Sequence, residues 1–302
     1  MRNAPDFVII GAMKCATTTL HEQLDAQAGV FMSEPKEPNF FSNDEQFQRG
    51  IDWYLSLFSS AQPGDLCGES STHYTKLPTY PSTIDRLKQH APNAKFIYVM
   101  RHPVERLISH YMHEWSRRTV SGSLSQALQV RPELYQYSQY SMQLKPYLET
   151  FGPDKVLPVF FERVKQFPEA ELARIGEFLQ CPQTLVWQAT AGHQHVTQER
   201  LRESPWRDAL VYAPGLSTIR KRLVPKSVRE WVKGLWQMRN RPQLSLQERA
   251  KLEAIFDQDL ATLSQWLGRE FSCANFREAA LAPASGWVGE HLPQPLATSS
   301  MR

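Results

Sequence analysis

Cysteine is scarce in this sequence of 302 residues, and its four cysteines lie far apart. They are Cys15, Cys67, Cys181 and Cys273, and no two of them form a Cys-x-x-Cys pair. This spacing excludes a disulfide framework and gives no support to a zinc site. Because isolated thiols are typical of reducing compartments, we expect a cytoplasmic protein.

Long hydrophobic runs are also missing. No apolar stretch approaches the ~18–20 residues that a membrane span needs. Residues 1–3 lead directly into a short apolar segment, without the hydrophobic core and cleavage site of a signal peptide, so we expect a soluble chain. The net charge of +3 is too small to indicate nucleic acid, and we expect no nucleic-acid partner.

The composition that remains is ordinary for a globular protein, with 41% hydrophobic and 22% charged residues. A chain of this length can bury a sizeable core. Neither an internal repeat nor a second core pattern is present, so we expect one domain over residues 1–282. Residues 283–302 are rich in Pro, Gly and Ser, which predicts a poorly ordered tail.

The segment 7–20, FVIIGAMKCATTTL, predicts a buried strand, a polar turn and a helix. Backbone N–H groups at such a turn and the positive end of the helix dipole attract an oxyanion, and Lys14 adds a full charge. The alternative is an ordinary surface lysine. A nucleotide P-loop requires Gly-Lys-Ser/Thr, whereas Cys15 follows Lys14 here, so the Walker pattern fails.

The segment 95–115 repeats this order, because the strand KFIYVM leads through Arg101-His102-Pro103 into a helix. Two such units predict a parallel sheet flanked by helices, an α/β fold. Pro158 suggests an edge position for a further strand at 156–161. The pattern also predicts a strand at 65–69, a loop at 31–43, and helices at 18–28, 47–58, 81–90, 123–130, 137–151, 169–179 and 246–267.

Four strings together carry a resemblance to a known family: FVIIGAMKCATTTL, KEPNFF, GESSTHY and YVMRHPVERLISHY. In this order they resemble the sulfotransferases that use 3′-phosphoadenosine 5′-phosphosulfate (PAPS). The similarity is greatest to the carbohydrate group, which includes the heparan sulfate N- and O-sulfotransferases and their bacterial relatives. The resemblance covers roughly the first 180 residues well. It implies a P-loop-like three-layer fold around a central parallel sheet.

The resemblance also implies roles for individual residues. Lys14 would stabilise the leaving phosphate, where negative charge grows during transfer. Arg101 and Ser109 would bind the 3′-phosphate, and Arg200 and Arg202 would close over it. The residues implied at the 5′-phosphate are Lys14, Cys15, Ala16, Thr17, Thr18 and Thr19.

Glu37 is the implied general base, because a carboxylate can take the proton of an attacking hydroxyl. Lys36 would keep Glu37 ionised or contact the sulfate, and Ser70, His73 and Tyr74 would line the acceptor site. Two residues depart from the family pattern. Ala16 replaces a glycine, which costs about 1 kcal/mol if the position needs positive φ. Ser70 replaces a lysine, which weakens the case for a heparan-like acceptor.

Several simpler interpretations remain open. Glu37 could be a solvated loop acid, and Arg101 could pair with Glu105 one turn later. His110 and His113 share a helix face, but no acidic or cysteine partners complete a metal site, so no metal is expected. The basic stretch 220–241 could contact an anionic membrane or an acidic acceptor, or could be a docked surface helix.

The sequence therefore predicts a PAPS-dependent sulfotransferase that acts on a hydroxyl, or as second choice an amine, of a carbohydrate or lipid-like acceptor. One alternative is a P-loop-type small-molecule kinase, which would need a Walker-type Gly-Lys-Ser/Thr and an acidic magnesium site, and neither is evident. The other is a non-enzymatic protein that binds membrane surfaces through 220–241.

Overall fold

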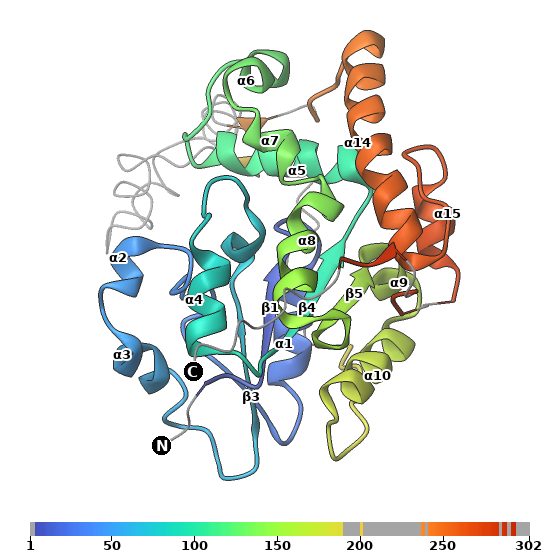
Figure 1. Ribbon diagram of the computed structural model, residues 1–302. Coiled ribbons are helices and arrows are strands. Elements are labelled where there is room, and N and C mark those ends of the chain that lie inside the picture. Colours follow the sequence, from blue (N-terminus) through green and yellow to red (C-terminus); the bar gives the residue numbers. More distant parts are fainter. Residues whose placement is uncertain are drawn as a thin grey trace, which may run out of the picture.

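The computed structural model describes residues 4–189, 200–201, 237–238, 241–283, 286–288 and 291–293. Five parallel strands form its central sheet in the order β2-β3-β1-β4-β5 (Figure 1). These strands are β1 (Phe7–Gly11), β2 (Val30–Met32), β3 (Leu66–Ser70), β4 (Lys95–Met100) and β5 (Val156–Phe160). A two-stranded antiparallel ribbon pairs β6 (Arg200–Leu201) with β7 (Gln237–Met238).

Apolar side chains explain why the central strands form. All five residues of β1 are buried, as are the last five residues of β4. A parallel sheet covered on both faces demands such continuous apolar runs. The predicted parallel α/β sheet is therefore confirmed, and β5, which contains Pro158, lies at the sheet edge as expected.

Helices cover both faces of the sheet and complete a three-layer fold. Right-handed crossovers place α1 and α10 on one face and α4 and α8 on the other, and α14 packs against α8 (Figure 1). The helices, with the short 3₁₀ turns η1 and η2, are α1 (Thr17–Asp25), α2 (Asp44–Phe47), α3 (Ile51–Ser56), η1 (Thr72–Thr75), α4 (Thr83–His90), α5 (Pro103–Ser116), α6 (Leu124–Val130), α7 (Glu133–Gln136), α8 (Tyr140–Phe151), η2 (Pro153–Lys155), α9 (Phe161–Gln166), α10 (Pro168–Leu179), α14 (Leu246–Leu267) and α15 (Phe276–Leu281).

The strand order creates one point where the connections diverge. The chain leaves β1 through α1 towards β2, and it leaves β4 through α5 towards β5, on the opposite side of the sheet. β1 and β4 are adjacent and parallel, so their carboxyl ends meet. In open α/β sheets, ligands bind in the crevice outside such a point.

Two predicted elements differ in the structure. The helix expected at 47–58 is divided into α2 and α3, because Gly50 lies between them with a φ of 85°. Strand β2 falls partly within the segment expected to be a loop. With three residues at the sheet edge, it gives too short an apolar pattern to be recognised.

The helix predicted at 246–267 is confirmed, together with its capping box. Ser245 Oγ accepts from the Glu248 N–H at 3.3 Å, and the Ser245 N–H donates to Glu248 Oε2 at 2.9 Å. One cluster of buried apolar residues, running from Phe7 to Ala280, joins this helix to the sheet within the described part of the chain.

Asp259, on α14, forms hydrogen bonds with the amino terminus of α8. Its carboxylate accepts hydrogen bonds from the N–H groups of Ser141 at 3.0 Å and Met142 at 3.1 Å. Gln139, the residue before α8, supplies no capping hydrogen bond of its own. The Asp259 side chain therefore satisfies backbone donors that the first turn of α8 cannot satisfy internally.

Candidate active site

The turn after β1 is held in one shape by close packing. A Cβ added at Gly11 would lie 2.1 Å from Thr75 Oγ1, which donates to the Ile10 carbonyl at 2.7 Å. Lys14 and Ala16 both adopt left-handed backbone, with φ values of 76° and 63°. The strain that the sequence predicted for an alanine at position 16 is therefore present.

Helix α1 begins at Thr17 without a side-chain cap on its first turn. The first N–H groups of a helix have no partner within the helix, and the dipole makes that end positive. Thr18 is exposed and Thr19 is half-buried at this end. An oxyanion such as a phosphate or a sulfate therefore fits the amino terminus of α1.

Cys15 differs from the other residues predicted at this turn. Its N–H donates to the Ala12 carbonyl at 3.1 Å, so this donor stabilises the turn itself. Its thiol is fully buried, and burial raises the pKa of Cys15 to about 12. Cys15 is therefore a neutral packing residue beneath the loop, and its N–H is not available to an anion in this conformation.

Arg101 occupies the corresponding turn after β4. The Tyr140 hydroxyl contacts both the N–H and the carbonyl of Arg101, which fixes the backbone there. The guanidinium lies 4.8 Å from the Phe161 ring and donates to Glu105 Oε2 at 3.2 Å. The simple pairing with Glu105 that the sequence left open therefore exists.

The same guanidinium also reaches the first turn. Arg101 Nη1 donates to the Lys14 carbonyl at 3.5 Å. This contact joins residues 87 positions apart in the sequence. The two turns that the sequence singled out therefore lie side by side at the diverging point of the sheet.

Ser109 and His110 are adjacent on helix α5 but differ in burial. Ser109 is half-buried and lies four residues after Glu105, so both are on the helix face that follows Arg101. His110 is buried, with Nε2 3.3 Å from Glu114 Oε1. Burial lowers the pKa of His110 to about 3, so this imidazole is neutral at pH 7.

Glu37 is anchored against the end of β3. Its N–H donates to the Ser70 carbonyl at 2.9 Å. Its Oε1 accepts from Lys36 Nζ at 3.2 Å and from Thr72 Oγ1 at 3.1 Å. Burial alone would raise the pKa of Glu37. The Lys36 ammonium and these hydrogen bonds outweigh that effect, so the pKa lies below its ordinary value of 4.5. The carboxylate is ionised at neutral pH and can accept a proton.

The predicted acceptor residues at the end of β3 do not all face open space. Tyr74 is 2% exposed, and its hydroxyl donates to Glu69 Oε1 at 2.9 Å. Ser70 is fully buried, with Oγ 2.9 Å from His21 Nδ1. The structure therefore corrects the expectation for both, because packing around the end of β3 buries Tyr74 and Ser70.

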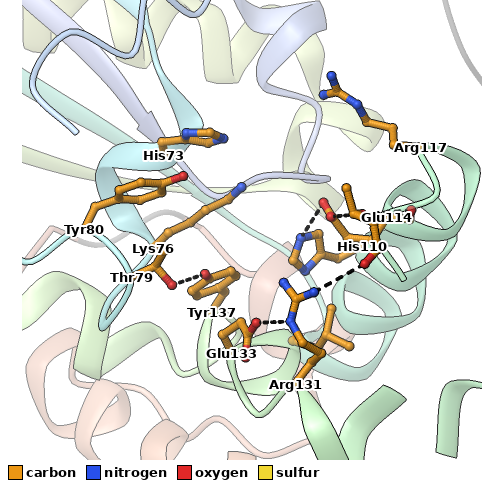
Figure 2. Close-up of a pocket in the computed structure, with 12 residues that line it drawn as sticks. His73, Lys76, Thr79, Tyr80, His110, Glu114, Arg117, Arg131, Glu133 and Tyr137 are labelled. Carbon is orange, nitrogen blue, oxygen red and sulfur yellow. Dashed lines mark hydrogen bonds and ion pairs between the residues drawn. The ribbon is translucent and has the colours of Figure 1, made fainter. Parts of the chain in front are cut away.

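His73 is the predicted acceptor residue that does line a cavity (Figure 2). Its ring stacks on Tyr80 with centroids 5.0 Å apart. Burial lowers the pKa of His73 to about 4, so the ring is neutral. The sequence drew attention to the string that contains His73, but it gave no signal for Thr72 as the partner of Glu37.

The later predicted residues fall mostly outside the described residues. Arg200 forms part of β6, whose partner strand is β7, while Arg202 lies beyond the described residues. The basic stretch 220–241 also lies there, apart from residues 237–238 and Arg241. Arg241 Nη2 donates to Glu105 Oε2 at 2.6 Å, which places this cation beside the Arg101 turn.

Among the described residues, no helix is both long and apolar enough to cross a membrane. In the same part of the chain, no group of three His, Cys, Asp or Glu is arranged to hold a metal ion.

A three-layer α/β fold with cationic turns at a diverging point defines a class of proteins that bind phosphate-bearing ligands. Within this class the chain belongs to the sulfotransferase family, since the model of the sulfotransferase domain matches residues 4–264. The fold is that of a crystallised sulfotransferase from Alicyclobacillus acidocaldarius. That structure aligns with a TM-score of 0.65 and 23% identity, over 90% of this chain and 98% of that chain.

Curated relatives include enzymes named for heparan sulfate. The mouse heparan sulfate glucosamine 3-O-sulfotransferase 3B1 is 28% identical over 187 residues, which are 59% of this chain and 46% of the relative. The bifunctional heparan sulfate N-deacetylase/N-sulfotransferase 1 of Caenorhabditis elegans is 24% identical over 198 residues, which are 60% of this chain and 23% of the relative. The match therefore spans less than half the length of either relative.

Proposed function

We propose that this protein transfers a sulfuryl group from PAPS to a hydroxyl of a carbohydrate or lipid-like acceptor, leaving 3′-phosphoadenosine 5′-phosphate (PAP). The observation that carries the proposal is the hydrogen bond from Arg101 to the Lys14 carbonyl at 3.5 Å. It places two cationic turns at one crevice in a chain of the sulfotransferase family. Together they suit a ligand that carries phosphates at both ends.

The residues present fit this donor. The uncapped amino terminus of α1 and the hydroxyls of Thr17, Thr18 and Thr19 would hold the 5′-phosphate. Arg101 and Ser109 would hold the 3′-phosphate, provided that Arg101 exchanges its bond to Glu105 for the anion. When bound, PAPS supplies the activated sulfuryl group. Lys14 would stabilise the charge that grows on the leaving phosphate.

Glu37 would act as the general base in this proposal. Both of its side-chain hydrogen bonds within the described residues reach Oε1, which leaves Oε2 to take the acceptor's proton. Lys36 and Thr72 hold the carboxylate in its ionised form. An enzyme of this kind works mainly by positioning and charge stabilisation, as in phosphoryl transfer.

A hydroxyl acceptor is supported by the relatives named as 3-O-sulfotransferases. The relatives named as N-sulfotransferases favour an amine as the second candidate. The ionised Glu37 suits the hydroxyl, because a hydroxyl must lose its proton as it attacks. The cytoplasmic location and the membrane contact through 220–241 stay predictions.

The test combines calorimetry with PAP and mass spectrometry of acceptor libraries after incubation with labelled PAPS. We expect Lys14→Ala and Arg101→Ala to weaken PAP binding about 10- to 100-fold, as expected for lost charge-assisted hydrogen bonds. Glu37→Gln should bind PAP normally and lose transfer. Lys145→Ala, on an exposed lysine of α8, is the control that should change neither. A wild-type protein that binds no PAP would overturn the proposal.

A further inference from the structure

A cavity of about 390 Å³ opens beside the predicted acceptor residues. Such a volume lies within the usual range for small-ligand sites. Figure 2 shows His73, Tyr80 and Lys76 on one side of it and helix α5 with His110 and Glu114 on the other. Aromatic rings therefore form one wall, and polar side chains face them.

Lys76 is the unusual member of this lining. It follows η1 directly and is only 7% exposed. Its ammonium lies 5.7 Å from the centre of the Tyr137 ring and has no hydrogen bond or ion pair within the described residues. In Figure 2 the amine end points into the cavity. Burial lowers the pKa of Lys76 to about 8, and the carboxylates of Glu114 and Glu37 act on its ammonium only through space. A negative group bound in the cavity would pair with this ammonium directly, so the site favours such a group.

The carboxylates of the cavity already have other partners. Glu114 accepts from His110 Nε2 at 3.3 Å and from Thr119 Oγ1, and Glu133 pairs with Arg131. The imidazoles carry no charge at pH 7, because burial lowers the pKa of His110 to about 3 and that of His73 to about 4. The Nδ1 atoms of both histidines are buried without a partner in the described structure.

The cavity is connected to the general base through η1. Thr72, at the start of η1, donates to Glu37 Oε1 at 3.1 Å, and the next residue, His73, lines the cavity. Lys76 follows the last residue of the same short helix. An acceptor whose hydroxyl lies at Glu37 would therefore extend over His73 towards Lys76.

We propose that this cavity is a subsite for an anionic substituent, such as a carboxylate, on the ring of the acceptor, and that Lys76 selects it. The proposal rests on the proposed sulfotransferase function and specifies its acceptor. Arg117, exposed at the cavity, adds a second positive charge.

Two glycosides that differ only at one carbon test this selection: 4-nitrophenyl β-D-glucuronide and 4-nitrophenyl β-D-glucoside. Their affinities for the full-length protein are measured by calorimetry, with and without saturating PAP. We expect the glucuronide to bind about tenfold more tightly, because only its carboxylate can pair with the buried ammonium.

Lys76→Met keeps the length of the side chain and removes its charge, so the preference should fall to about one. Lys76→Arg should retain part of it, and Lys145→Met on α8 should retain all of it. A preference that persists in Lys76→Met overturns the proposal, as does wild-type protein that binds the glucuronide no better than the glucoside. PAP affinity is recorded for each variant. If the wild-type protein does not bind PAP, that result contradicts the proposed function instead.

Discussion

The donor side and the acceptor side of the proposed site are built by different means. The donor side, formed by the turns after β1 and β4, depends on backbone: left-handed residues, a glycine without room for a side chain, and an uncapped helix. The acceptor side, formed by Glu37, η1 and the cavity beside it, depends on side chains from separate segments. Substitutions should therefore act on stability and PAP binding on one side, and on pKa values and selectivity on the other.

Gly11→Ala should have the largest effect, because the new Cβ would lie 2.1 Å from Thr75 Oγ1. Relief requires breaking the buried bond from Thr75 to the Ile10 carbonyl. Overpacking together with a lost hydrogen bond predicts a loss of about 3 kcal/mol in unfolding free energy. Urea denaturation measures it. Gly64→Ala is the control, since Gly64 also has positive φ but has no atom within 4 Å of the added Cβ. Equal losses would show that crowding does not define the turn.

Glu69→Gln tests the buried side chains behind the acceptor side. Burial raises the pKa of Glu69 from 4.5 to about 7. Because the folded state holds this proton more tightly, the unfolding free energy contributed by Glu69 is greatest below pH 4.5. It falls as pH rises to about 7, by a few kcal/mol at most.

The glutamine variant should lose this dependence. Its amide can still accept from Tyr54, while the Ser71 hydroxyl can rotate to accept instead of donate. Denaturation of both proteins from pH 5 to pH 8 gives the difference. Parallel curves would mean that Glu69 titrates in the folded protein as it does in the unfolded chain.

Thr72→Val removes the hydrogen bond to Glu37 Oε1 while it keeps the shape of the side chain. We expect the pKa of Glu37 to rise, because this bond favours the carboxylate. The acid limb of the pH–rate profile should move to higher pH, and kcat should fall about threefold to tenfold, as for one hydrogen bond. PAP affinity should not change. An unchanged acid limb would remove Glu37 as the base that the profile reports.

Ala16→Gly should have the smallest effect, and it should stabilise the protein. The alanine has a φ of 63°, and glycine relieves strain of about 1 kcal/mol, partly offset by the greater freedom of glycine in the unfolded chain. Thermal denaturation should show a small increase in Tm. Ala26→Gly, at a φ of −77°, should lower Tm instead. A decrease at both positions would mean that the turn does not hold Ala16 in the left-handed region.

The contrast between the two sides also explains what the sequence could predict. The strand, turn and helix around Lys14 are local in sequence, and their apolar and polar pattern defines them directly. The meeting of Lys14 with Arg101 follows from the topology of parallel strands. Both features were predictable, and so was the capping box at Ser245 and Glu248.

Contacts between distant side chains were not predictable in this way. The distant partner of Glu37 is Thr72, and the buried Tyr74 hydroxyl donates to Glu69 in the core. Lys76 faces a cavity that helices α5 and α7 complete, more than thirty residues further along the chain. No periodicity in the sequence encodes such placements, because packing decides them.

The bond between Asp259 and α8 has a consequence for the order in which the chain can mature. The groups that Asp259 satisfies, the N–H groups of Ser141 and Met142, leave the ribosome more than one hundred residues before it. In the nascent chain, the layer that contains α8 therefore stays incomplete until α14 has been synthesised. Its apolar residues Phe256 and Leu260 then close over the sheet domain together with the carboxylate. Completion of this layer is thus a late step in the folding of the chain.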